Sequence, residues 1–482
     1  MKFNVLTEPW IPARDKQGNV REMGILEVLE KAVELTEITD AMPHYEYGMY
    51  RMLFVFLMDV YRPRKEDDLE DLLYEEEFDF GRIREYVNEC NRNGERFDLL
   101  DEEFPFMQCG RSQWTAEAKI KSPANLSPVS AAGNNHVHFD HCLEKDKTFS
   151  LKEAAKAVCA VNLFCTSGAQ GYPSTPSGAP PVYSIVKGNS LFETLVYGMV
   201  PVSAERSKDC PLWRSTAAIE SKKEVAAVSL LEGLTFPCRR IRILTSEDNV
   251  VSAVLFEQGM NYVNYDAWTD PYVTYYRSKN GRANLKPSID KETWRDLDTL
   301  MDHQECAPET VKQYLRLRGE GAAEMCTVCT YSVVTNQAAY LDIQKGEYVL
   351  PDIVIRSSNR FTCLRDALDR TEAQGKALYG AISLLEKEMK FDGKTGACAS
   401  EKERTVQRYF GEAKTMFFNW LCPSLRDLPG DQLAECREQW EAKMKKLCWD
   451  EYERFTKRLG SDIRMMMAAQ KVRNNLRGKE NQ

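Results

Sequence analysis

The sequence lacks several features that would assign a function directly. Its 482 residues include only 5 histidines. No apolar run approaches the roughly 20 residues that a membrane-spanning helix needs. We find no Gly-x-x-x-x-Gly-Lys-Ser/Thr loop, no Gly-x-Gly-x-x-Gly after a strand, no His-Glu-x-x-His helix and no Gly-x-Ser-x-Gly elbow. The common signatures of nucleotide-binding proteins, metalloproteases and serine hydrolases are therefore missing.

Positive charge is also scarce, and it is unevenly divided. The chain carries 64 basic and 73 acidic side chains, a net charge of −9, which speaks against a protein that binds a polyanion by itself. Residues 361–482 hold 23 basic and 19 acidic side chains, which leaves 41 and 54 for the first 360. The final 29 residues hold eight basic and two acidic side chains.

This C-terminal strip has two interpretations, a solvated helical tail or a surface that faces phosphates. We predict a basic face that guides displaced DNA or contacts a neighbouring subunit, made by Arg454, Lys457, Arg458, Arg464, Lys471, Arg473 and Arg477.

Cysteine usage indicates a reducing compartment. The 15 cysteines are odd in number and form no compact framework. The chain starts with Met-Lys-Phe, and we expect no signal peptide. We therefore expect free thiols in a cytoplasmic protein. The one Cys-x-x-Cys pair, Cys326 and Cys329, supplies two of the four ligands of a zinc site. Alone it is a weak signal, so we predict no bound metal and no cofactor.

Hydrophobic patterns predict an α+β fold: a large mixed domain over residues 1–360, followed by a four-helix bundle over 361–482. In the first part, apolar density predicts a buried helix over 43–61, and the capping box of Ser150 and Glu153 predicts another helix start. Strands are expected over 181–186 and 249–256.

The second part has a helical period throughout. Apolar and small residues from Leu364 to Met389 alternate at spacings of four and three, which is typical of a helix packed at a shallow angle against others. Further helices are expected near 406–420, 433–459 and from 463 onward. Breaks are expected at 391–396, from Pro423 to Gly430, and at Gly460.

One histidine cluster suggests chemistry. The segment 133–142 contains His136, His138, His141 and Cys142. Alternate residues of a strand point the same way, so His136 and His138 suit one metal ion, with Asp140 as the nearest general base. A metal-dependent hydrolase is thus our alternative function. A polar recognition loop and a plain structural loop are the competing interpretations.

Several short segments, in order along the chain, resemble the CasA family, the large subunit of the type I-E CRISPR Cascade surveillance complex. They are Leu6–Pro12 with Gly18, Arg96–Leu100, Pro105–Gln108, Gly133–Asn135 with Phe139–His141, Ser177–Gly188, and Asn336–Ala338. Each segment is short, but their collinear order makes the resemblance fairly specific. A mixed domain followed by a helical bundle is also the family's architecture.

The resemblance implies a non-catalytic subunit. Its partners would be the other Cascade subunits with guide RNA, double-stranded target DNA and a helicase-nuclease. It would recognise the protospacer-adjacent motif (PAM), promote duplex opening and R-loop formation, and recruit the helicase-nuclease for antiviral defence. In such systems guide pairing reads the long sequence, and the protein reads only the flank and the backbone.

The resemblance also implies site residues. Asn336, Gln337 and Ala338 match the family's glutamine wedge, whose amides can exchange hydrogen bonds with base edges while unstacking costs about a few kcal/mol per step. The alternative is a polar hairpin turn between strands near 333–334 and 340–341. The remaining predicted DNA contacts lie in two loops: Asn134, Asn135, Phe139 and His141 in the first, and Gly171, Tyr172, Ser174 and Gly178 in the second.

This chain departs from the family pattern in three places. Tyr172, Pro173, Thr175 and Pro176 replace flexible positions of the glycine loop, so the accepted flanking bases do not transfer from relatives. The cysteine pair that holds zinc in some members is replaced by Ala154–Val158. The lysine that reads the minor groove in a relative has no match near Gln258.

Overall fold

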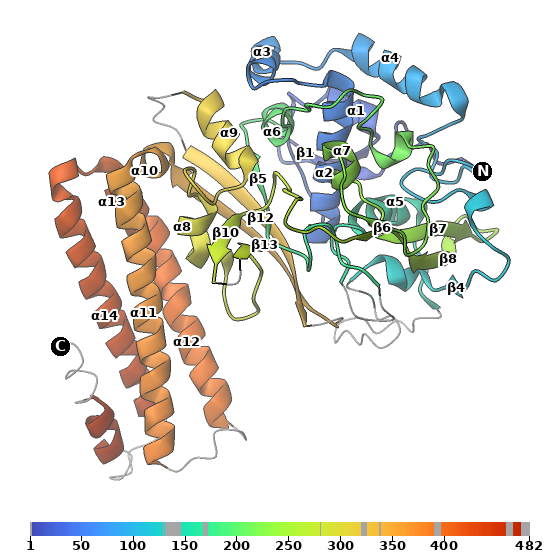
Figure 1. Ribbon diagram of the computed structural model, residues 1–482. Coiled ribbons are helices and arrows are strands. Elements are labelled where there is room, and N and C mark those ends of the chain that lie inside the picture. The colour runs from blue at the N-terminus through green and yellow to red at the C-terminus, as the bar shows by residue number, and fades with distance from the viewer. Residues whose placement is uncertain are drawn as a thin grey trace. The chain divides into compact units, whose positions relative to one another are not determined.

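Two compact units make up the computed structural model (Figure 1), which describes residues 2–128, 130, 146–166, 172–279, 281–319, 325–336, 339–389, 397–458 and 466–473. The first unit comprises 1–289, 303–319 and 327–348, and the second comprises 290–302, 320–326 and 349–482. The second unit therefore begins before the predicted position 361 and includes two earlier segments. Helices already begin at 352 and 358, ahead of the leucines on which the sequence-based boundary rested.

The first unit is built around one buried helix, α2 (Pro43–Tyr61), which has the predicted bounds. Every residue from His44 to Val60 is buried, as expected for a helix that is apolar on all sides. Pro43 occupies the first turn, where its missing N–H costs nothing. The helix ends at Arg62, which adopts a left-handed conformation with φ 47° directly before Pro63.

Smaller helices pack around α2. Ser150 forms the predicted capping box of α5, because its Oγ accepts from the amide of Glu153 while its own amide donates to the Glu153 carboxylate. Gly48 lets α5 approach, since a Cβ there would meet Ala160 at 3.0 Å. The helices of this unit are α1 (Ile25–Glu30), α2, α3 (Asp67–Glu75), α4 (Phe80–Cys90), α5 (Leu151–Ala160), α6 (Leu191–Gly198), α7 (Leu230–Leu234) and α9 (Glu309–Leu317).

The strands form small sheets, mostly antiparallel, with orders β2-β1-β3, β13-β12-β5, β4-β8-β7, β10-β11 and the parallel pair β6-β9. The predicted strands at 181–186 and 249–256 are confirmed as β5 and β8. The strands are β1 (Ile11–Asp15), β2 (Val20–Met23), β3 (Leu35–Ile38), β4 (Ile120–Lys121), β5 (Tyr183–Lys187), β6 (Glu224–Val225), β7 (Arg239–Thr245), β8 (Val251–Gln258), β9 (Asn261–Tyr262), β10 (Tyr275–Ser278), β11 (Gly281–Asn284), β12 (Met325–Asn336) and β13 (Ala339–Pro351).

Long helices dominate the second unit. The heptad positions of α11 from Leu364 to Leu385 are buried, as predicted. Trp440 of α14 donates through its indole N–H to the carbonyl of Ala367 at 3.0 Å and contacts the Thr371 hydroxyl at 3.2 Å. The helices are α8 (Leu297–Leu300), α10 (Asp352–Arg356), α11 (Ser358–Glu388), α12 (Ala397–Met416), α13 (Cys422–Asp427) and α14 (Leu433–Arg458).

The later breaks differ from the prediction. Pro423 does not end a helix but lies in the first turn of α13, where proline is tolerated. A π-helical turn at Phe417–Leu421 joins α12 to α13, so the break moves to residues 428–432. Of the predicted fourth helix the structure describes 466–473, and these residues are helical. The mixed α+β class with a helical C-terminal region is confirmed.

No helix in the described ranges is long and apolar enough to cross a membrane.

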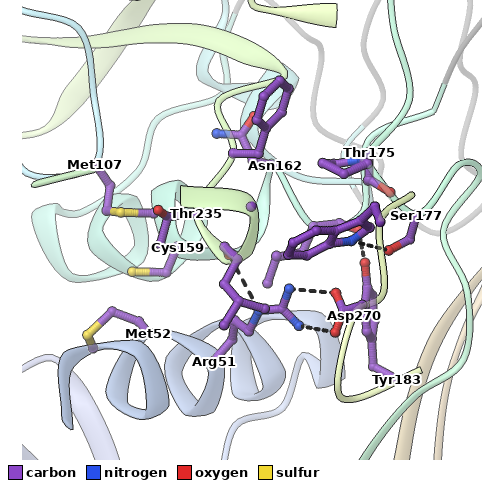
Figure 2. A pocket seen from close by; sticks show the side chains of 16 residues that line it. Arg51, Met52, Met107, Cys159, Asn162, Thr175, Ser177, Tyr183, Thr235 and Asp270 are labelled. Carbon is purple, nitrogen blue, oxygen red and sulfur yellow. Dashed lines mark hydrogen bonds and ion pairs between the residues drawn. The ribbon is translucent and has the colours of Figure 1, made fainter. Parts of the chain in front are cut away.

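A buried ion pair joins α2 to a distant segment of the first unit (Figure 2). The Arg51 guanidinium binds the Asp270 carboxylate through two hydrogen bonds of 2.6 and 3.0 Å, although the residues are 219 positions apart. Arg51 also donates to the Tyr47 hydroxyl at 2.9 Å and lies 4.8 Å from the centre of the Tyr272 ring. Both charged side chains are at most 5% exposed, so each depends on the other for compensation.

Asp270→Asn should destabilise the first unit by about 3–5 kcal/mol, because it leaves the Arg51 cation buried without a counter-charge. Urea unfolding followed by tyrosine and tryptophan fluorescence measures this loss. The matched control is Glu66→Gln, which removes a half-exposed pair with Arg316 and should cost at most about 1 kcal/mol. Equal stability losses for the two variants would contradict the central role of the buried pair.

Candidate nucleic-acid interface

The predicted wedge lies at the end of a long hairpin. Asn336 is the last residue of β12 and is exposed, and β13 begins at Ala339, so only Gln337 and Ala338 separate the strands. Those two residues lie outside the described part of the chain. Strands therefore flank the predicted wedge on both sides, and β12 pairs with β13 on one side and with β5 on the other (Figure 1).

Buried polar contacts hold this hairpin in place. The Tyr331 hydroxyl of β12 donates to the Glu46 carboxylate of α2 at 2.6 Å. Lys345 of β13 forms an ion pair with the same carboxylate at 2.7 Å. The strands are thus attached to the central helix, and the end of the hairpin has a rigid support.

The hairpin also contacts the start of the predicted glycine loop. Tyr340, the second residue of β13, donates through its hydroxyl to the carbonyl of Phe164 at 3.3 Å. Phe164 lies three positions before residues 167–171, which are outside the described residues and include the predicted contact Gly171. This hydrogen bond joins the strand after the predicted wedge to the segment before the predicted glycine loop, and its two residues are 176 positions apart in sequence.

Side-chain contacts hold the described part of the predicted glycine loop, which begins at Tyr172. Tyr172 is half-buried between two cations, with Arg239 at 4.9 Å and Lys121 at 5.3 Å from its ring centre. Ser174 is buried, and its hydroxyl lies 3.4 Å from that of Tyr265. Gly178 has φ +80°, a conformation that favours glycine. Of these predicted contacts, Ser174 faces the protein interior.

The other predicted loop falls within residues 131–145, and the chain is described on both sides of that range. Asn134, Asn135, Phe139 and His141 lie outside the described residues, as do His136, His138 and Cys142 of the alternative metal cluster. The stem residue Ser127 lies with its hydroxyl 3.4 Å from Nε2 of His44. Burial lowers the pKa of His44 to about 3, so this contact joins two neutral groups at physiological pH.

The basic face of the second unit is more neutral than its sequence suggests. Four of the five described cations of this face are paired with glutamates: Arg454 with Glu451, Arg458 with Glu401, Lys471 with Glu388 and Arg473 with Glu453. Lys457 is exposed on the same helix. Arg464 and Arg477 lie outside the described residues. The sequence count missed these partners because two of them come from α11 and α12.

The Cys-x-x-Cys pair does not suit zinc. Cys326 and Cys329 lie on one strand at a spacing of three, so their side chains point to opposite faces. Burial raises the pKa of both thiols, whereas zinc binds thiolates. Cys329 also contacts the Glu347 carboxylate at 3.5 Å.

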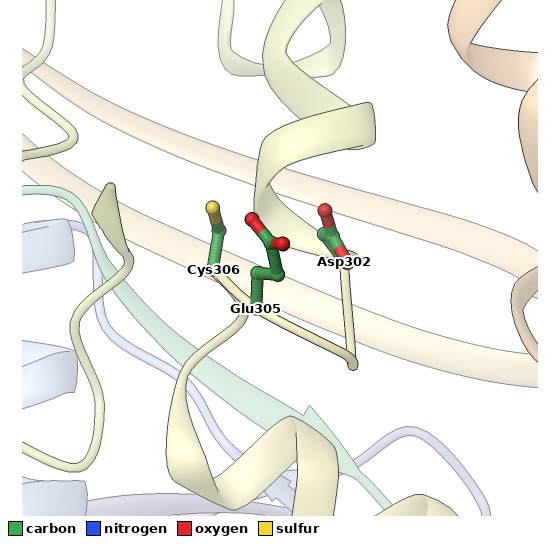
Figure 3. A group of neighbouring side chains, drawn as sticks. All are labelled: Asp302, Glu305 and Cys306. Atoms are coloured by element: carbon green, nitrogen blue, oxygen red, sulfur yellow. The ribbon is translucent and has the colours of Figure 1, made fainter. Parts of the chain in front are cut away.

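A turn between α8 and α9 gathers three possible ligands, Asp302, Glu305 and Cys306 (Figure 3), whose ligand atoms lie within 4.8 Å of one another. The Asp302 carboxylate already accepts a hydrogen bond from Arg365 at 2.9 Å. Exposed acidic groups are common in turns, so this cluster carries no assignment.

The pocket around Arg51 and Asp270 is small. Its volume of about 20 Å³ holds about one water molecule. Trp268 closes one side and donates through its indole N–H to the Ser177 hydroxyl at 3.3 Å. This pocket is too small for a nucleotide.

Comparison with known proteins identifies the family. A family model described as CRISPR-associated protein Cse1 matches residues 4–450. The chain belongs to the Cse1 family. This Cse1-family chain is 28% identical over 406 residues to the CRISPR-associated protein CasA/Cse1 of Thermus thermophilus, a match that covers 78% of this chain and 76% of the relative. The resemblance predicted from the short motifs is confirmed.

Solved structures share the Cse1 fold. Thermus thermophilus CasA (Cse1) has a TM-score of 0.78 at 22% identity, with 99% of each chain covered. Thermobifida fusca Cse1 has a TM-score of 0.79 at 21% identity, covering 99% of this chain and 97% of the other. A chain of a CRISPR RNA-guided surveillance complex has a TM-score of 0.80 at 18% identity, covering 98% and 99%. At these identities the matches establish the fold.

Three residues that contact the predicted loop or the segment before it were not predicted from the sequence of this Cse1-family chain: Lys121, Arg239 and Tyr340. The one available signal was the strand Arg239-Arg-Ile-Arg242, where three arginines interrupt an apolar strand. Because the pattern gives no partner for any of them, it could not distinguish a buried clamp from a solvated edge.

Metal analysis by inductively coupled plasma mass spectrometry should find far less than one zinc or manganese ion per chain, because the Cys326 and Cys329 thiols are buried and point apart. Cys326→Ser with Cys329→Ser should therefore leave the metal content unchanged. His136→Ala with His138→Ala is the comparison variant. Stoichiometric metal that disappears only in the histidine variant would support the hydrolase alternative.

Proposed function

We propose that this chain is the non-catalytic large subunit of a type I-E Cascade surveillance complex. In that complex it recognises the motif flanking the target in double-stranded DNA, promotes duplex opening and recruits the helicase-nuclease. Membership of the Cse1 family supports the assignment, as does the fold shared with a chain of an RNA-guided surveillance complex. The partners would be guide RNA, the other subunits, target DNA and the nuclease.

One observation carries most of this proposal. The hydrogen bond from Tyr340 to the Phe164 carbonyl holds β13, two residues after the predicted wedge, beside the segment that leads into the predicted glycine loop. A flank reader and a wedge that act on neighbouring base pairs need this proximity, because opening has to begin next to the recognised motif. A polar hairpin turn with no role in DNA binding would not need it.

The rigid support of the hairpin suits a wedge. Separating a base step costs about a few kcal/mol, so a wedge must not yield when the duplex resists. The attachment of β12 and β13 to Glu46 of α2 provides this resistance. The amides of Asn336 and Gln337 supply donors and acceptors for the exposed base edges.

The acidic balance of the chain fits a subunit better than an autonomous DNA-binding protein. Guide pairing and the other subunits would provide most of the affinity, and this chain would provide discrimination at the flank. The thirteen cysteines whose side chains the structure describes are free thiols, as suits work in the cytoplasm.

Gln337→Ala in the assembled complex should slow duplex opening about tenfold and change initial association much less, because the amide is needed only once base pairs separate. Stopped-flow fluorescence of 2-aminopurine beside the flank measures opening, and filter binding measures association. Gln344→Ala, on β13 but away from the turn, is the matched control. Normal opening in the Gln337 variant would show the wedge assignment to be wrong.

Replacing Lys457, Arg458 and Lys471 by glutamine should reduce the slope of log K against log salt by about one unit for each phosphate that these side chains neutralise. The measurement is target binding by the complex at several salt concentrations. A control triple variant on α14, with Lys443, Lys445 and Lys446 changed to glutamine, makes the same change in charge. If both triple variants keep the full slope, the basic face is a solvated surface.

A further inference from the structure

A buried arginine joins the two stems of the glycine loop. Arg239 is the first residue of β7 and is 5% exposed. One terminal nitrogen, Nη1, donates to the Pro173 carbonyl at 2.7 Å, and the other, Nη2, donates to the Thr166 carbonyl at 2.7 Å. The planar guanidinium fixes the spacing of its two nitrogens, so one side chain fixes the positions of the Thr166 and Pro173 carbonyls relative to each other.

The position of Arg239 is itself fixed by its neighbours. Its amide donates to Oδ1 of Asn162 at 2.8 Å, and Nη1 also donates to the carbonyl of Cys238 at 3.0 Å. Among the described residues, Arg239 forms no ion pair with a carboxylate. A buried cation held only by carbonyls and a ring keeps its positive field, which extends to the surface beside it.

The outer side of this arrangement is a tyrosine between two cations. The Tyr172 ring lies against the Arg239 guanidinium, and the Tyr172 hydroxyl accepts a hydrogen bond from Nζ of Lys121 at 2.9 Å. Phe256 packs edge-on against the same ring at 6.2 Å. Lys121 thus keeps a fixed place and has N–H donors to spare for a phosphate oxygen.

We propose that Arg239 is the positioning residue of the flank-reading surface, and that Lys121, held beside Tyr172, is a contact to the DNA backbone there. Arg239 acts through Tyr172 and does not itself touch DNA. The backbone contact sets the distance of approach, and base edges are read only at the right distance. This inference rests on the proposed function and extends it to two residues that the family motifs do not include.

The test uses assembled complexes that carry Arg239→Gln, Arg239→Lys or Lys121→Gln. Each is given four targets: a flanked duplex, an unflanked duplex, a flanked duplex opened in advance by mismatches, and a single strand. The matched control is Arg242→Gln, because Arg242 is also a buried arginine of β7 that donates to main-chain carbonyls, here those of Asp101 and Glu102. Neither of these two hydrogen bonds of Arg242 reaches the stems of the glycine loop.

Arg239→Gln and Arg239→Lys should both lower binding of the flanked duplex about tenfold, because lysine keeps the charge but cannot hold two carbonyls as a fork. Binding of the single strand should not change. Lys121→Gln should reduce the slope of log K against log salt for the flanked duplex by about one unit, because one phosphate contact is lost. Arg242→Gln should match the wild type on all targets.

Two results would overturn the inference while the proposed function stands. In both, the wild type prefers the flanked duplex. The first result is that Arg239→Lys and Arg239→Gln retain the full preference of the wild type for the flanked duplex. The second is that Arg242→Gln loses this preference as much as the Arg239 variants do. A wild-type complex with no preference for the flanked duplex would instead overturn the proposed function. If Arg239→Gln fails to assemble, hydrogen exchange of the full-length Arg239→Lys chain decides: faster exchange in 162–176 than in wild type supports the clamp, and unchanged exchange rejects it.

Discussion

The complete burial of α2 is the constraint on which the first unit depends. A helix with no exposed face needs a partner for every polar side chain that it carries into the core. Arg51 therefore faces Asp270, Glu46 accepts from Tyr331, and Asp59 accepts from Tyr86 and binds Arg214. Each partner comes from a different, distant segment. Satisfying three polar groups on one helix thus helps to determine where four separate parts of the chain lie, including the strand that leads to Asn336.

Arg239 is also a buried charged residue that needs hydrogen-bond partners. Its guanidinium is buried and satisfied by carbonyls at the stems of a surface loop, so the need to satisfy a core cation also orders a surface segment. Tyr340 connects the chain just before that segment, at Phe164, to the β12–β13 hairpin. Recognition surfaces on loops are precise only when their ends are held by rigid elements. In this chain the rigid elements are α2, β7 and the β12–β13 hairpin, and the supporting interactions are buried polar contacts.

Periodicity explains which parts of the fold could be predicted. The bounds of α2, the capping box at Ser150 and the heptad seam from Leu364 depend on residues close in sequence, so the sequence alone predicts them. The pairing of Arg51 with Asp270 and of Arg239 with Thr166 and Pro173 depends on which distant segments meet, and no local pattern encodes that. For the same reason, the sequence did not show that cations of the C-terminal strip are paired, because their partners Glu388 and Glu401 lie on other helices. Family motifs supplied the candidate wedge, but not the residues that hold it.

Weak non-specific binding is an advantage for a protein that must search DNA for a short flank. Affinity for any sequence comes mainly from counterion release at unpaired cations. In the described residues, four of the C-terminal cations are paired with glutamates, and the first 360 residues are acidic, with 41 basic and 54 acidic side chains. A complex that contacts unflanked DNA through this subunit would therefore gain little and dissociate quickly. One proposed backbone contact, Lys121 beside Tyr172, would then weigh more in target choice, since the specificity ratio governs that choice in a large excess of competing sites.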